Sequence, residues 1–82
     1  MTEISKENNV VSEENKKMFI RLNAEQEQLN SKKNALNAFI GTNMFEKLSK
    51  HAKDLLVLQY KSMSEYSSIL TMRIELFKKE NN

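Results

Sequence analysis

The chain has 82 residues, with 13 Lys and Arg, 11 Asp and Glu, one His, one Gly, and no Pro, Cys or Trp. This length accommodates one domain. A core of this size contributes only about 3–5 kcal/mol to the stability, so small domains usually rely on a disulfide, a bound metal or a partner chain. The absence of cysteine excludes disulfides and thiolate sites, and a single histidine makes a zinc site unusual. We therefore expect neither a metal nor a cofactor.

The net charge of +2 is spread along the chain without a basic block, so binding to duplex nucleic acid is not indicated. No apolar run approaches the roughly 20 residues that a membrane span requires, and the first residues lack the apolar core of a signal peptide. We therefore expect a cytoplasmic protein that does not enter a membrane.

Residues 1–11 are polar and rich in Asn, without a helical period, which predicts a frayed or disordered tail. Ser12 is followed by two glutamates, as is typical of a helix N-cap. Apolar residues then recur at helical spacing and predict a helix over residues 12–40: Met18, Leu22, Leu29, Leu36, Phe39 and Ile40. Gly41 is expected to end this helix in the left-handed conformation.

Residues 41–48 are expected to form the tip of a hairpin, because three apolar side chains gather beside the only glycine: Met44, Phe45 and Leu48. Ser49 is an N-cap candidate for a second helix over residues 49–79, and Lys78 and Lys79 suit its last turn. The two helices are each roughly 45 Å long. Equal lengths and a short connection predict an all-α, antiparallel two-helix hairpin forming one domain over residues 12–82.

The second helix has more apolar surface than the first helix can cover. Burial of a Leu, Ile or Phe side chain is worth roughly 1.5–3 kcal/mol, so we expect another chain to cover the remainder. The sequence thus predicts a homo-oligomeric helical bundle, most simply a twofold dimer. Its predicted interface residues are Leu55, Leu58, Met63, Ile69, Leu70, Met72, Leu76 and Phe77.

Gln59, Tyr66 and Arg73 are seven residues apart in the second helix and share one face. In one interpretation they pair with Glu25, Gln26 or Asn30 of the first helix, or with a symmetry-related chain, and set the register of the bundle.

In the other interpretation Gln59, Tyr66 and Arg73 line a ligand pocket between protomers. Arg73 would hold a phosphate with two parallel hydrogen bonds. Tyr66 or Tyr60 would stack on a base, Gln59 would contact a base edge, and Lys61 would add positive charge.

No residue pattern indicates catalysis. The paired carboxylates have no histidine beside them, no general base is identifiable near a serine or threonine, and one glycine cannot form a phosphate-binding loop. We therefore expect a protein that is not an enzyme.

From Leu22 to Lys78 the sequence resembles a family of small helical proteins of tailed phages, named after a crAss-like phage homologue. The matching residues are Leu36, Phe39, Ile40, Phe45, Leu48, Asp54, Leu55, Leu56, Gln59, Met63, Tyr66, Leu70 and Arg73. Lys53 departs from the pattern, where a glutamine or an acid is expected.

The resemblance implies a phage origin, a helical hairpin and no catalysis. Small phage proteins of this kind counter host defence, either by sequestering a cyclic or linear nucleotide signal or by binding a host defence protein. The first role would use the pocket between protomers. The second would use an exposed face of the hairpin, such as Met44 and Phe45 at the tip.

Overall fold

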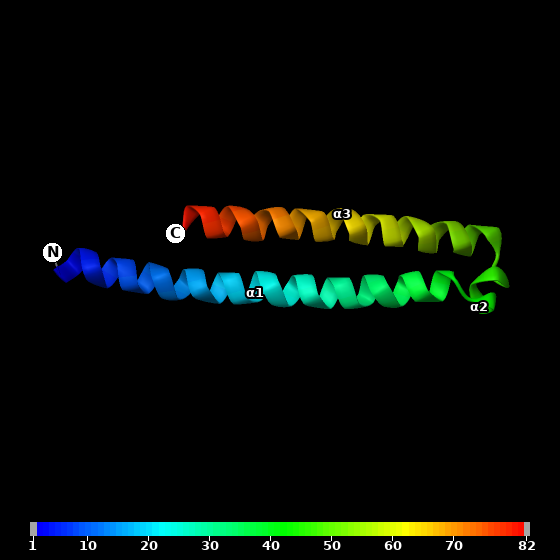
Figure 1. Ribbon diagram of the computed structural model, residues 1–82, viewed down its shortest axis with the longest axis horizontal. Coiled ribbons are helices and arrows are strands. Elements are labelled where there is room, and N and C mark those ends of the chain that lie inside the picture. The colour runs from blue at the N-terminus through cyan, green and yellow to red at the C-terminus, as the bar shows by residue number, and fades with distance from the viewer. Residues whose placement is uncertain (1, 82) are drawn as a thin grey trace.

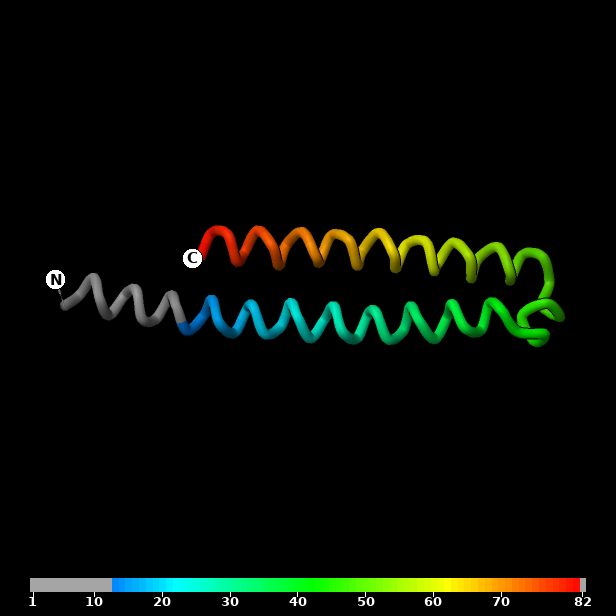
Figure 2. Tube along the Cα trace, in the orientation of Figure 1, coloured from blue at the N-terminus to red at the C-terminus, as the bar shows by residue number. Residues whose placement is uncertain are grey.

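Two long helices lie side by side and antiparallel in the computed structural model, which describes the backbone of residues 2–81 and the side chains of residues 13–81 (Figure 1). The elements are α1 (Thr2–Ile40), α2 (Asn43–Glu46) and α3 (Lys50–Glu80). Figure 2 shows that the chain reverses once, at the end where α2 lies. The predicted all-α hairpin with a short helix at its tip is confirmed.

The start of the first helix was predicted at Ser12, after a polar tail over residues 1–11. The backbone of α1 is helical from Thr2, ahead of that position. The side chains of residues 1–12 lie outside those that the structure describes, so the cap at Ser12 stays a prediction. At the other end, α1 ends at Ile40, directly before the glycine.

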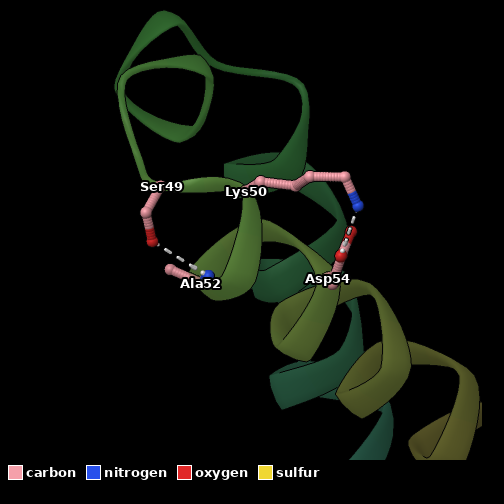
Figure 3. A network of polar contacts seen from close by, with 4 residues as sticks. All are labelled: Ser49, Lys50, Ala52 and Asp54. Carbon is pink, nitrogen blue, oxygen red and sulfur yellow. Dashed lines mark hydrogen bonds and ion pairs between the residues drawn. The ribbon is translucent and has the colours of Figure 1, made fainter.

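Two hydroxyl side chains cap the helices that follow the turn. The Thr42 hydroxyl accepts a hydrogen bond from the Phe45 N–H at 3.3 Å, and Ser49 Oγ accepts one from the Ala52 N–H at 3.1 Å. Figure 3 shows the Ser49 cap beside an ion pair in which Lys50 Nζ lies 3.0 Å from an Asp54 carboxylate oxygen. Such caps satisfy N–H groups that the first turn of a helix leaves without a partner.

Gly41 differs from the expected left-handed helix end. No residue of the described backbone has a positive φ, Gly41 included. Instead the Gly41 N–H donates to the Ala38 carbonyl at 3.2 Å, and the Thr42 N–H donates to the Phe39 carbonyl at 3.0 Å. These bonds span three residues and tighten the last turn, which satisfies helix-end carbonyls without a left-handed residue.

The tip is closed by an aromatic contact between α1 and α2. Phe45 is 6% exposed and lies edge-on to Phe39, with 6.2 Å between the ring centroids. Met44 points outward and is 69% exposed. Phe45 therefore belongs to the hairpin core, and its assignment as a contact for another protein is corrected.

The hairpin core is a single row of side chains between α1 and α3. Leu22 packs against Leu70 and Ile74, and these three residues are at most 5% exposed. Phe19 extends the row and lies 5.5 Å from Phe77 between ring centroids. The core is thin because each helix contributes one narrow strip of its surface.

A polar layer interrupts this core near the middle of the helices. Ser67 Oγ donates to Asn30 Oδ1 at 2.8 Å, and the Gln26 side-chain amide donates to the Thr71 hydroxyl. The same amide also approaches the Ser67 carbonyl at 3.4 Å. These bonds fix which turn of α1 lies against which turn of α3.

Within the described residues, no helix contains an apolar stretch of the length that a membrane span requires.

Candidate functional site

Three polar residues lie in a row along the exposed surface of α3: Gln59, Tyr66 and Arg73, which we call the polar row. Each is exposed, and Tyr66 retains 40% of its accessible surface. A spacing of seven residues is about 10 Å along a helix and returns to nearly the same side. The hairpin thus displays all three side chains on one flank of α3.

If the polar row paired with α1, its side chains would bond to residues such as Gln26 and Asn30. Other residues of α3 form those hydrogen bonds. Gln26 and Asn30 bond to Thr71 and Ser67, which face α1. The register within the hairpin is therefore fixed by these neighbours and not by the polar row. This leaves the side chains of the polar row free to meet a ligand or another chain.

Tyr60 and Lys61 are separated from the polar row. Tyr60 is half-buried, and the Lys33 ammonium of α1 lies 5.7 Å from its ring centroid. Lys61 is exposed, but two residues from Gln59 is about 200° around a helix. The five predicted ligand residues therefore do not form one group, and the polar row is the part that shares a surface.

Arg73 borders a shallow pocket of about 160 Å³ near the open end of the hairpin. The pocket is lined by Met18, Leu22, Arg73, Leu76, Phe77 and Glu80. Apolar side chains around a guanidinium weaken its hydration and favour its hydrogen bonds to an anion. This pocket is the most suitable place on the polar row for a charged ligand group.

A second arginine lies next to this pocket. Arg21 lines a neighbouring surface depression together with Glu14, Lys17 and Met18, and Met18 also lines the Arg73 pocket. The described residues form ion pairs between Lys50 and Asp54 and between Lys53 and Glu46, and neither pair involves an arginine. Both guanidinium groups are therefore available for an anion.

Five exposed apolar residues lie on one face of α3, and we call them the exposed stripe: Leu55, Leu58, Ile69, Met72 and Leu76. Their exposed fractions are 52%, 57%, 48%, 61% and 55%. The residues recur in steps that fit one helical face, next to the polar row. Val57 is also exposed, but it lies to the side of this face.

The other predicted interface residues face α1. Leu70 is 0% exposed and belongs to the hairpin core, so its assignment to an interface between chains is corrected. Met63 and Phe77 are half-buried, and Phe77 contacts Phe19. The surface left for another chain is therefore narrower than the predicted one and consists of the exposed stripe.

The exposed stripe is large compared with the core. Four hydrophobic side chains are buried among residues 13–81: Leu22, Phe45, Leu70 and Ile74. Full burial of each such side chain stabilises a protein by about 1.5–3 kcal/mol. The five half-exposed side chains of the stripe therefore leave a stabilisation on the order of 5 kcal/mol unrealised. That amount is similar to the whole contribution of a core of this size.

Sequence reasoning missed Arg21 and Met18 as neighbours of the polar row. A usable signal was present, because Arg21 and Arg73 are the only arginines of the chain and an antiparallel hairpin brings their turns to the same end. The missing information was the rotation of α1, which decides whether Arg21 faces the same side as Arg73.

The arrangement suits binding by charge and by stacking. A guanidinium can grip a phosphate with two hydrogen bonds, and a tyrosine ring offers a flat surface to a base. Within residues 13–81, no three His, Cys, Asp or Glu side chains gather as metal ligands would.

Comparison with known protein families identifies a family that covers most of the chain. The family model described as Sequestin matches residues 16–76, about three quarters of the chain. The matched region includes the tip, the whole polar row and the exposed stripe. No curated protein and no solved structure matches the chain.

Proposed function

Because the chain belongs to the Sequestin family, we propose that it is a non-enzymatic protein that sequesters a nucleotide signal. The family is named for sequestration, which fits a small hairpin that binds and holds another molecule. In this proposal the protein is encoded by a phage and acts in the host cytoplasm. It captures a cyclic or linear nucleotide of host immunity in a pocket between subunits of a homo-oligomer.

The exposed guanidinium of Arg73 is the observation that carries the proposal. It has no ion pair among the described residues, and the shallow pocket beside it is lined by four apolar side chains and Glu80. A surface arginine that serves only solubility needs no apolar pocket around it, whereas a phosphate site gains from one. Tyr66, on the same flank, supplies the aromatic surface for a base.

Arg21 is the second cationic group of the proposed site. It lies on α1 and shares Met18 as a neighbour with Arg73. A nucleotide with more than one phosphate can use both guanidinium groups. We expect Arg21→Ala to weaken binding less than Arg73→Ala, because Arg21 lies outside the apolar pocket.

The test is native mass spectrometry of the protein with cyclic AMP, cyclic GMP, cyclic di-AMP and cyclic di-GMP. We expect a stoichiometric adduct with at least one of them. Arg73→Ala should weaken that adduct at least about tenfold, since a hydrogen bond to a charged group contributes about 1.5–3 kcal/mol.

Lys61→Ala is the matched control, because it removes the same charge from an exposed position of α3 that lies away from the polar row. It should leave the adduct unchanged. Equal losses in the two variants would show that only the overall charge matters. Absence of any nucleotide adduct would contradict the proposal and favour the alternative, an inhibitor that binds a host defence protein. In that case capture experiments with Met44→Ala would follow, because Met44 is the exposed apolar side chain at the tip.

A further inference from the structure

Four residues of the exposed stripe lie at about equal distances on either side of one point of α3, the midpoint between Glu65 and Tyr66. Leu55 precedes Glu65 by ten residues, and Leu76 follows Tyr66 by ten. Leu58 precedes Glu65 by seven residues, and Met72 follows Tyr66 by six. Ile69 lies near the centre, opposite the small side chain of Ser62. A helix face with this symmetry is complementary to a second copy of itself that runs in the opposite direction.

We infer that a second copy of this chain covers the exposed stripe, antiparallel along α3, with a twofold axis between Glu65 and Tyr66. In such an interface, residue i of one copy meets residue j of the other, and j meets i. Leu55 then meets Leu76 of the second copy, and Leu58 lies within one residue of the position opposite Met72. Because the exposed stripe lies on the side of α3 away from α1, the two α3 helices lie together in the middle, with one α1 on each outer side.

The charges at the two ends of the stripe support this direction. His51 and Glu80 are each fourteen residues from the central pair, so the His51 imidazole lies against the Glu80 carboxylate of the second copy. Asp54 lies within one turn of Lys79 of the second copy. A parallel pairing would set each charged residue against its own copy, which is unfavourable for like charges.

This pairing completes the proposed ligand site from two chains, and in this respect the inference rests on the proposed function. Gln59 and Arg73 are six and seven residues from the central pair, on the same flank as Tyr66. Arg73 of one copy therefore lies beside Gln59 of the other. Each site combines a guanidinium and a tyrosine ring of one copy with an amide of its partner copy.

The dimer then has two equivalent sites. The two Arg73 residues are about 20 Å apart along the helices, which is too far for one mononucleotide to reach both. We expect one nucleotide per chain and two per dimer. A site within a single hairpin would give the same number per chain but would not need the second copy.

The contact itself is tested first, by sedimentation of Ile69→Glu. Ile69 is 48% exposed in the hairpin, so the variant keeps its helices by circular dichroism and changes from dimer to monomer. Ile20→Glu is the matched control, because Ile20 is 65% exposed on α1 and lies outside the stripe. It should stay dimeric. A dimeric Ile69→Glu, or a monomeric wild-type chain, would overturn the inference.

Disulfide cross-linking tests the register, since the natural chain has no cysteine. Leu55→Cys and Leu76→Cys, each oxidised alone, should stay uncrosslinked, whereas an equal mixture should give a covalent dimer. A parallel pairing would give the opposite result, with each variant cross-linking to itself.

Complementation then tests the shared site with the nucleotide that forms an adduct in native mass spectrometry. Arg73→Ala and Gln59→Ala should each bind poorly alone, whereas their mixed dimer keeps one intact site and binds one nucleotide. Failure of complementation with correct cross-linking would overturn the shared site and leave the dimer standing. Correct cross-linking with no nucleotide bound by the wild-type chain would overturn the proposed function instead.

Discussion

Gly41 joins α1 to the tip with a negative φ, so the position does not require glycine. A Cβ atom added there would lie 3.6 Å from the Ala38 carbonyl oxygen, an ordinary contact. Gly41→Ala should therefore stabilise the protein by about 0.4–1 kcal/mol, because alanine restricts the unfolded chain more than glycine does. The measurement is the free energy of unfolding in urea.

Ala35→Gly provides a comparison of opposite sign, since Ala35 is an exposed residue within α1. It should cost about 1 kcal/mol, the difference in helix propensity between the two residues. If Gly41→Ala instead lowered the stability, the left-handed conformation expected from the sequence would be correct and the tightened turn described above would be wrong.

Single residues at the helix ends were predictable because their signals are local. A serine or threonine before an apolar run can bond only to nearby N–H groups, and both Thr42 and Ser49 do so. The conformation of Gly41 was not predictable in the same way. Glycine permits both a left-handed end and a tightened turn, and the choice depends on where the tip packs.

At the scale of elements, α2 acts as a plug, because Phe45 is its buried residue and contacts Phe39. Phe45→Ala should destabilise the hairpin by about 3 kcal/mol, within the range measured for buried phenylalanines. Since that loss approaches the whole stability of a small core, the variant should be largely unfolded by circular dichroism.

Two further variants keep this prediction testable if Phe45→Ala does not fold. Phe45→Leu keeps most of the buried volume and should cost less than about 1.5 kcal/mol. Met44→Ala changes a 69% exposed residue and should alter the stability by less than about 0.5 kcal/mol. Equal effects of Phe45→Ala and Met44→Ala would contradict the role of α2 as a plug.

The pairing of whole helices shows where sequence reasoning reached its limit. Periodicity correctly predicts two long helices and an apolar excess on the second, but several strips of α3 fit steps of three and four. The strip that faces α1 includes Tyr60, Ser67 and Ile74, one residue away from the polar row. Polar residues of α1, such as Asn30, determine which strip of α3 faces α1, because they bond to that strip. Which residues of α1 lie opposite which residues of α3 follows only from the register of the two helices.

For the whole molecule, the thin core and the exposed stripe together predict that stability depends on protein concentration. If the folded state is a dimer, a hundredfold increase in concentration adds roughly 2.7 kcal/mol to its apparent stability. The melting temperature of the wild-type chain, followed by circular dichroism, should therefore rise with concentration. Ile69→Glu should have a lower melting temperature that does not change with concentration. The melting temperature of Ile20→Glu should rise with concentration, as in the wild type. A wild-type melting temperature that is constant over this range would mean that the hairpin is stable alone and that the exposed stripe faces solvent.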